Sequence, residues 1–332
     1  MKVYIITEGG SNFGLGHVAR CTSLYQAFEE KKINPYFIIN GDPTLTTILS
    51  DKNYYILDWF KEPKKLFEQI RGADIVIIDS YLIDRLLAQK ISKSIKLAIF
   101  IDDTMRIKYP KGVVINSAIH AKMLPYPKKQ NVKYLLGAEY SMLKKEFWDS
   151  QKKIINDEIE VLMLTLGGND IANLSPKILK ILQDEYPHIK KKVIVGKNFQ
   201  NIKDIENICN ESSQLIYFPN SQSMKEMMLE SDIAITAGGQ TVYELASIGL
   251  PAITISVIDH QIPHIKACAE FGLNFYAGWW QDKAIFDNIR FFLNELRSIE
   301  IRTKMIQMCR KFVKADGSRD IIAFLIELMN KK

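Results

Sequence analysis

The alternation of short apolar runs with helix-period segments constrains the fold of this chain more than any other feature. Apolar runs of strand length recur along almost all of the 332 residues. Between the first two runs, apolar residues return at the spacing of one helix face: Val18, Cys21, Leu24, Tyr25 and Phe28. The continuous apolar run at 75–78 suits a parallel strand that is covered on both faces. The pattern therefore predicts an α/β fold with parallel sheets.

The alternation is interrupted at 149–158 by a polar stretch, DSQKKIINDE, which is typical of a linker. Before the linker we predict strands at 3–7, 35–39, 54–57, 74–78, 96–101, 113–115 and 134–136. After it we predict strands at 159–165, 192–195, 214–217, 232–236 and 252–255. The helices predicted between these later strands lie at 172–184, 198–210, 221–230, 240–248 and 263–271.

The chain is thus predicted to form two Rossmann-like, doubly wound domains, over 1–150 and 151–315. A last helical segment in 316–332 is expected to pack back on the first domain. Open parallel sheets bind ligands at the carboxyl ends of their strands. Two such sheets facing each other predict a ligand-binding cleft between the domains.

Composition limits the classes of function. Apolar residues make up 47% and charged residues 25%, which is ordinary globular usage. The net charge of +6 comes from dispersed lysines without interleaved aromatics, which favours a solvated surface over a nucleic-acid site. With no signal-peptide pattern and no apolar run of roughly 18 residues, we expect a cytoplasmic protein without stable membrane insertion, either a monomer or a weak oligomer. The 4 cysteines are far apart in sequence, so neither a metal site nor a cofactor is predicted.

A glycine turn follows the first predicted strand and opens a helix. It contains Gly14 and Gly16, followed by His17 and Arg20. Glycines let the backbone approach a ligand, and a helix N-terminus attracts anions. The segment also fits the G-x-G-x-x-A form of the dinucleotide fingerprint. Two features speak against that alternative: six residues, 8–13, separate the predicted strand from the turn, and Asn40 stands where the fingerprint has an acidic residue.

His17 is the main candidate for a catalytic residue. An imidazole at the mouth of a glycine turn is exposed to the predicted cleft and lies beside the expected anion site. Our hypothesis is that the helix N-terminus disfavours the imidazolium and keeps His17 a neutral base. The alternative is a helix-start residue that takes part in no chemistry.

Two further glycine turns lie at predicted strand ends in the second half. Gly168 belongs to the first of these, which is equally well explained as a plain βα turn with Asn169 or Asp170 as a helix N-cap. The second turn precedes a helix start, again an anion-binding arrangement, and its candidate binding residues are Gly239, Gln240, Thr241 and Glu244. Glu244 is placed to accept hydrogen bonds from ribose hydroxyls, or alternatively only to compensate the helix dipole.

Together these motifs resemble the PseG/SpsG family. The resemblance rests on GLGHVARC at 14–21, DSYLID at 79–84, IDD at 101–103, LGGND at 166–170 and TAGGQTVYELASIGLP at 236–251. The best-known members of that family are UDP-2,4-diacetamido-2,4,6-trideoxy-β-L-altropyranose hydrolases of pseudaminic acid biosynthesis. The last motif is shared with MurG-like glycosyltransferases of the GT-B fold, so it marks the architecture and the UDP site more than the reaction.

The resemblance implies a GT-B fold, with the sugar site and the catalytic histidine in the first domain and UDP in the second. His17 matches the family's catalytic histidine, and Tyr81 matches a tyrosine near the sugar. The implied reaction is a metal-independent, inverting hydrolysis at the anomeric carbon that releases UDP, with Arg20 and helix N-termini supplying positive potential. The sequence departs from the family at 258–261, where His260 precedes Gln261 near the expected substrate site. Tyr140 is a further candidate pocket residue.

Two other functions fit the same sequence. A glycosyltransferase would use the same UDP site, although no basic or apolar patch for an acceptor is evident in the first domain. A nucleotide-sugar binding module without activity is the second alternative, and the presence of His17 beside Gly14 and Gly16 speaks against it.

Overall fold

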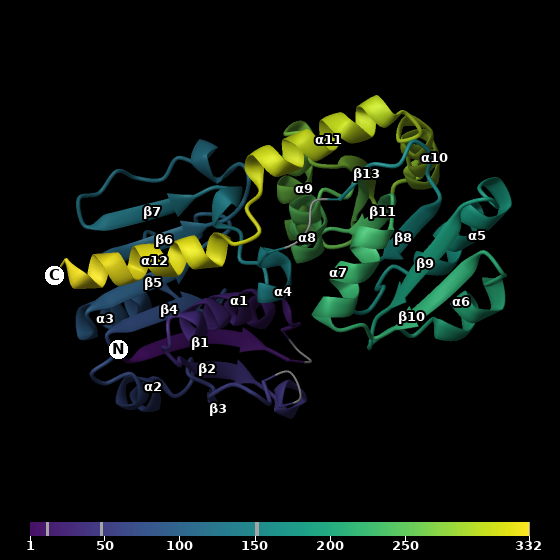
Figure 1. Cartoon of the computed structure of the whole chain (residues 1–332). Coiled ribbons are helices and arrows are strands. Elements are labelled where there is room, and N and C mark those ends of the chain that lie inside the picture. The colour runs from purple at the N-terminus through teal and green to yellow at the C-terminus, as the bar shows by residue number, and fades with distance from the viewer. Residues whose placement is uncertain (11–12, 47–48, 150–152, 332) are drawn as a thin grey trace. The chain divides into compact units, whose positions relative to one another are not determined.

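The computed structural model describes residues 1–10, 13–46, 49–149 and 153–331, apart from the side chain of His260. The chain divides into two compact units, one of Met1–Lys145 with Asp316–Lys332 and one of Glu146–Ala315 (Figure 1). Each unit contains one fully parallel sheet, which confirms the predicted α/β class. The cleft expected between the two units stays a prediction. In the described part of the chain, no helix has the length and apolar character that a membrane span needs.

The first unit contains a 7-stranded sheet in the order β3-β2-β1-β4-β5-β6-β7. Its strands are β1 (Val3–Gly9), β2 (Tyr36–Gly41), β3 (Tyr54–Ile56), β4 (Ile75–Asp79), β5 (Leu97–Ile101), β6 (Gly112–Asn116) and β7 (Val132–Leu136). The helices of this unit are α1 (Gly16–Glu30), α2 (Pro63–Gln69), α3 (Arg85–Ser94) and α12 (Gly317–Asn330). The short α4 (Lys145–Trp148) lies where the chain passes to the second unit.

The core of the first unit lies on both faces of its sheet. Every residue of β1 and of β4 is buried, as expected for central parallel strands. Helix α1 buries the apolar stripe that the sequence predicts, and α12 packs against α1 and the 3₁₀ turn η3 (Ala138–Tyr140). The approach at the start of α12 is close, because a Cβ added to Gly317 would lie 2.5 Å from the carbonyl oxygen of Ser141. The last helix is therefore an integral part of the unit that contains α1.

The second unit contains a 6-stranded sheet in the order β10-β9-β8-β11-β12-β13. Its strands are β8 (Val161–Thr165), β9 (Lys190–Val195), β10 (Ser213–Tyr217), β11 (Ile233–Ala237), β12 (Ala252–Ser256) and β13 (Phe275–Trp279). Its helices are α5 (Ser175–Glu185), α6 (Ile202–Ile208), α7 (Ser221–Glu230), α8 (Gln240–Ile248), α9 (Ile262–Glu270), α10 (Ile285–Glu295) and α11 (Ile299–Phe312), and a 3₁₀ turn, η4 (Asp259–Gln261), precedes α9.

The structure departs from the sequence prediction in the sheets at β1 and β13, and it adds helices α10 and α11, which were not predicted. Strand β1 continues beyond residue 7, because Glu8 and Gly9 pair in register with Asn40 and Gly41 of β2. The pattern also fails to predict β13, whose Gly278 has φ +127 and interrupts the apolar run.

Candidate functional site

Strand order places a polar cluster at the centre of the first sheet. β1 and β4 are neighbours, while the chain continues from β1 to β2 on one side and from β4 to β5 on the other. The carboxyl ends of β1 and β4 therefore flank a topological switch point, where open α/β sheets bind ligands. Asp79 ends β4, Asp103 lies two residues beyond β5, and α1 brings His17 and Arg20 to the same edge.

A closed glycine loop sets the start of α1. The backbone groups of Gly10 and Gly14 bond to each other in both directions, with N–O distances of 3.0 and 2.8 Å. Gly14 has φ +73, a conformation that side chains rarely adopt. Gly9 allows β1 and α1 to approach closely, because a Cβ there would lie 2.3 Å from Cγ2 of Val18. These glycines thus fix where His17, at the second position of α1, meets the sheet.

The ring of His17 is oriented by a buried carboxylate. Nδ1 of His17 lies 2.7 Å from Oδ1 of Asp79, whose side chain is 0% exposed. An ionised Asp79 can only accept hydrogen bonds, so Nδ1 carries the proton and donates it. The lone pair is then on Nε2, which has no hydrogen-bond partner among the residues that the structure describes. A histidine held in this way can accept a proton at Nε2.

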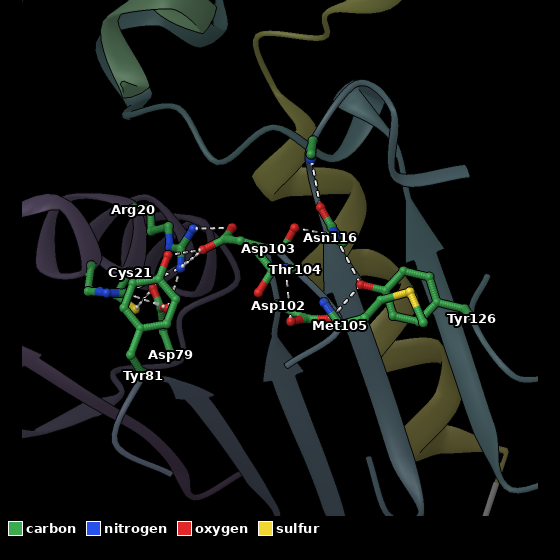
Figure 2. A network of polar contacts seen from close by, with 12 residues as sticks. Arg20, Cys21, Asp79, Tyr81, Asp102, Asp103, Thr104, Met105, Asn116 and Tyr126 are labelled. Carbon is green, nitrogen blue, oxygen red and sulfur yellow. Dashed lines mark hydrogen bonds and ion pairs between the residues drawn. The ribbon is translucent and has the colours of Figure 1, made fainter. Parts of the chain in front are cut away.

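Arg20 connects Asp79 to Asp103. Its Nε donates to Asp79 at 2.5 Å and its Nη1 donates to Asp103 at 2.8 Å. Nη2 donates to both carboxylates, at 2.6 and 3.0 Å, so the guanidinium is bidentate to each (Figure 2). The thiol of Cys21 also donates to Asp79, at 3.4 Å. Arg20 is therefore engaged in holding the cluster, and its predicted contact with substrate stays a prediction.

The charges of the cluster keep both carboxyls ionised. Burial alone would raise the pKa of Asp79, but the charges of Arg20 and His17 hold that pKa well below its usual range. Burial also opposes ionisation of Asp103, and Arg20 again lowers the pKa. Two carboxylates face one guanidinium, so a proton taken up by His17 would make this set of four side chains neutral.

Tyr81 packs against His17 from the loop after β4. The two rings meet edge to face with their centroids 4.7 Å apart. The phenol donates to Asp103 at 2.8 Å, and the pKa of Tyr81 is raised by burial and by the Asp103 charge. The backbone N–H of Tyr81 donates to Oε1 of Glu8 at 2.6 Å. Tyr81 thus joins the carboxyl end of β1 to the His17 cluster.

A second polar network supports the loop that contains Asp103. Asp102 accepts from the backbone N–H groups of Thr104 and Met105 and from the hydroxyl of Tyr126. Asn116 at the end of β6 donates to Tyr126 and to the carbonyl oxygen of Asp103 (Figure 2). Met105 has φ +57, a rarely populated conformation that these bonds help to hold.

In the second unit the first glycine turn lies after β8, at a comparable switch point between β8 and β11. Gly167 has φ +82, and a Cβ on Gly168 would meet no atom within 4 Å, although the Gly168 carbonyl accepts the backbone N–H of Asn198 at 3.1 Å. Asp170 is buried and accepts from the backbone N–H groups of Leu174 and Ser175, each at 2.9 Å. Asp170 thus bonds backbone groups at the start of α5, but the N-cap residue is Leu174, so the predicted N-cap at 169 or 170 is wrong.

The second glycine turn of this unit follows β11 and opens α8. Gly238 is tightly packed, because a Cβ there would lie 1.9 Å from Cδ1 of Ile265, and its N–H donates to Ile255 at 2.9 Å. Gly239 has φ +142 and is the N-cap of α8. The amide of Gln261 lies over this turn, with Nε2 3.8 Å from the Cβ position of Gly239. Its Oε1 is buried without a hydrogen-bond partner among the described residues.

The structure brings together some of the predicted residues and leaves others apart. His17, Arg20 and Tyr81 form one cluster beside the loop of Gly14 and Gly16. The second group gathers at the start of α8: Gly239, Gln240, Thr241, Glu244 and Gln261. Tyr140 ends η3, and no contact described here joins it to either group. The side chain of His260 lies outside the described part of the structure.

Sequence reasoning missed three carboxyl groups of the first cluster. Asp79 and Asp103 stood inside quoted motifs without a role, and Glu8 was taken as lying beyond its strand. The signal was present for Asp79 and Asp103, since polar residues directly after apolar parallel strands gather at one edge of the sheet. Among the described residues, no three His, Cys, Asp or Glu side chains are grouped to hold a metal ion.

Comparisons with known proteins show what this chain is similar to. Residues 162–277 match the model of the glycosyltransferase family 28 C-terminal domain. The chain is 23% identical over 285 residues to the spore coat polysaccharide biosynthesis protein SpsG of Bacillus subtilis, covering 82% of each. It is 24% identical over 277 residues to the pseudaminic acid cytidylyltransferase and UDP-2,4-diacetamido-2,4,6-trideoxy-β-L-altropyranose hydrolase of Helicobacter pylori, covering 82% of this chain and 48% of that protein.

A third relative is the uncharacterized protein MJ1062 of Methanocaldococcus jannaschii, 25% identical over 270 residues. The match covers 77% of this chain and 55% of MJ1062. This chain therefore spans only about half the length of MJ1062 and of the Helicobacter pylori protein.

Solved structures show the same architecture. MurG of Acinetobacter baumannii has a TM-score of 0.69 at 14% identity, covering 98% of this chain and 100% of that chain. A Staphylococcus aureus MnaA structure with UDP has a TM-score of 0.66 at 15% identity, covering 99% and 97%. Likeness at such identity shows the fold alone, and the predicted two-domain GT-B fold is confirmed.

Proposed function

We propose that this chain, a PseG/SpsG-like protein of GT-B fold, hydrolyses a UDP-linked 2,4-diacetamido-2,4,6-trideoxy sugar at its anomeric carbon. The products would be UDP and the free sugar, for the biosynthesis of pseudaminic or a related nonulosonic acid. The observation that supports this most directly is the His17–Asp79 pair, with Nε2 of His17 left as an acceptor.

In the proposed reaction His17 acts as the general base. Its Nε2 takes a proton from water while the water oxygen bonds to the anomeric carbon. The bond between that carbon and the diphosphate oxygen breaks, and its electron pair leaves with UDP, so the configuration at the carbon is inverted. Asp79 holds the Nδ1–H and stabilises the imidazolium that forms, the role that an acidic residue plays beside a basic histidine. The proposal uses no metal ion and no cofactor.

The second unit supplies the proposed nucleotide site. Gly239, Gln240 and Thr241 lie at the start of α8, where backbone N–H groups and the helix dipole favour a diphosphate. Two buried oxygens at this edge, Oε1 of Gln261 and Oγ of Ser256, have no partner among the described residues. Unsatisfied polar atoms next to a glycine turn fit a polar ligand. We assign Glu244 to the ribose and Gly168 to the phosphates.

We place this reaction in the cytoplasm. Cys21, Cys268 and Cys309 are buried as free thiols, which suits a reducing compartment. Burial raises the pKa of each of these thiols, so they are inert.

A glycosyltransferase is the second candidate, favoured by the family 28 match over 162–277. Both reactions would use the same UDP site and differ in what attacks the sugar. The test is to incubate the protein with a panel of UDP-sugars in ¹⁸O-water without any acceptor. Release of UDP with the label on the free sugar supports hydrolysis by attack at carbon. Label on UDP, or UDP release only after an acceptor is added, would overturn it.

A further inference from the structure

Glu8 is a buried carboxyl at the carboxyl end of β1. It is 2% exposed and belongs to the strand next to β4, so it lies at the switch point of the first sheet. Its Oε1 accepts the backbone N–H of Tyr81 at 2.6 Å, across 73 residues of sequence. Its Oε2 is buried and has no hydrogen-bond partner among the described residues. A carboxyl held in this way is costly, because a buried polar group without a partner loses its hydration.

The free-energy cost of this buried carboxyl indicates that Glu8 has a role beyond packing. An apolar side chain of similar size would fill the same volume at no polar cost, although it would leave the Tyr81 N–H without an acceptor. Burial raises the pKa of Glu8, which favours the uncharged acid beside the ionised Asp79. In either protonation state a carboxyl oxygen accepts the backbone N–H of Tyr81.

Tyr81 connects Glu8 to His17, the proposed catalytic residue. The Tyr81 residue is 45% exposed, so core packing fixes it only in part. The hydrogen bonds that hold it include the backbone N–H to Glu8 and the phenol to Asp103. Its ring meets the ring of His17 edge to face at 4.7 Å. Loss of the backbone anchor would let the ring shift relative to the imidazole.

We propose that Glu8 is a positioning residue that holds the backbone of Tyr81 and thereby keeps the ring of His17 in its reactive orientation. The inference rests on the proposed hydrolysis for its kinetic consequence. It makes no use of contact between Glu8 and substrate, because the carboxyl is buried.

The test compares Glu8→Ala with Glu8→Gln in steady-state hydrolysis of the UDP-sugar. Glu8→Ala removes the acceptor, and kcat should fall about 10–100-fold with little change in KM, as expected when a reacting group is slightly misplaced. Glu8→Gln keeps an acceptor oxygen and should recover most of that loss. Leu66→Ala, at a buried position of α2, controls for a general loss of stability in the same unit.

A double-mutant cycle separates positioning from a purely structural role. In a Tyr81→Ala background the ring that transmits the effect is gone, so Glu8→Ala should cost less than about twofold in kcat, because the two residues act as one unit. An equal loss of kcat with and without the Tyr81 ring would overturn the proposal. So would a Glu8→Gln protein as slow as Glu8→Ala.

A measurement that does not depend on turnover separates this inference from the proposed function. Nitrogen-15 NMR of the His17 ring, assigned by its absence in His17→Asn, reports the Nδ1–H form directly. Glu8→Ala should shift these resonances and Leu66→Ala should not. If the wild type hydrolyses no UDP-sugar but the shift occurs, the hydrolase proposal fails and the positioning role stands. If the wild type is active and Glu8→Ala moves neither kcat nor the resonances, the positioning role fails alone.

Discussion

The imidazole of His17 lies in two opposing electrostatic fields. The N-terminus of α1 disfavours a positive ring, by about 0.3–1 kcal/mol for an exposed site. The Asp79 carboxylate at 2.7 Å favours it, and a hydrogen bond to a charged partner contributes about 1.5–3 kcal/mol. Our hypothesis that the helix start keeps His17 a neutral base considered only the helix, because the sequence gives no distance between residues 17 and 79, and it stays a prediction.

The Asp79→Asn protein tests that balance. The amide nitrogen of asparagine can donate to Nδ1 and place the ring proton on Nε2, so the base loses its lone pair. We expect kcat for UDP release to fall about 10²–10⁴-fold with the fold intact, the range associated with general-base catalysis. Steady-state kinetics measure this, and circular dichroism checks the fold. Cys21→Ala removes another donor to Asp79 without changing the tautomer and should stay within a few-fold of wild type. Full activity in Asp79→Asn would contradict the assignment.

Ionisation of Asp103 makes the free energy of unfolding depend on pH. Its pKa in the folded protein lies below the unfolded value, so the ionised carboxyl stabilises the fold above the unfolded pKa of about 4. This contribution is lost as the pH falls through the folded pKa. Urea unfolding from pH 7 down to pH 3 should show wild type losing stability more steeply than Asp103→Asn below about pH 4. Parallel curves for the two proteins would show that Asp103 has no such effect.

At the scale of secondary-structure elements, hydrophobic periodicity predicts those strands and helices that depend mainly on local sequence. The central strands are continuous apolar runs and lie close to their predicted bounds, and α7 and α8 begin and end where the spacing places them. β13 is missed because Gly278 interrupts its apolar run, and pairing with β12 holds this strand in the sheet. Periodicity and local motifs predict only part of the candidate site. The turn with His17 is local, whereas Asp79 and Asp103 join it through strand order, which no local pattern encodes.

The contribution of the Asp170 carboxyl to the stability of the start of α5 can be measured. Its carboxyl accepts two backbone N–H groups at the start of α5 and one amide N–H of Asn201. Asp170→Ala leaves these donors unsatisfied, and we expect the free energy of unfolding to fall by about 1–3 kcal/mol. Asp170→Asn keeps one acceptor oxygen and should lose less. Calorimetric unfolding of the two variants decides this, and equal stability of Asp170→Ala and wild type would show that the carboxyl contributes nothing.

On the scale of the whole molecule, the two units place glycine turns at comparable points but surround them with different chemistry. Each unit has a switch point between two central strands, β1 and β4 in one and β8 and β11 in the other. In the first unit the carboxyl edge carries Asp79 and Asp103, with Arg20 between them. In the second the edge carries the glycine turns of Gly168 and Gly239, with the Gln261 amide over the latter. Such a division suits proton transfer in one unit and anion binding in the other.

This division predicts that a destabilising substitution in one unit affects turnover and UDP binding differently. Helix α12 comes last in the sequence but packs on α1, which contains His17, and Ile322 of α12 is 0% exposed. Ile322→Ala should cost about 2–5 kcal/mol in the first unit. In rising urea, turnover should then be lost at a midpoint about 1–2 M lower, given typical denaturant slopes, while the midpoint for UDP binding stays in place.

Matched variants make this prediction decisive. Ala323→Ser lies on the exposed side of the same helix and should leave both midpoints unchanged. Ile289→Ala, in the core of the second unit on α10, should lower both midpoints, because hydrolysis needs bound UDP-sugar whereas UDP binding needs only the second unit. If Ile322→Ala lowers the midpoint of UDP binding as far as that of turnover, the nucleotide site depends on the first unit, and the assignment of UDP to the α8 turn alone is wrong.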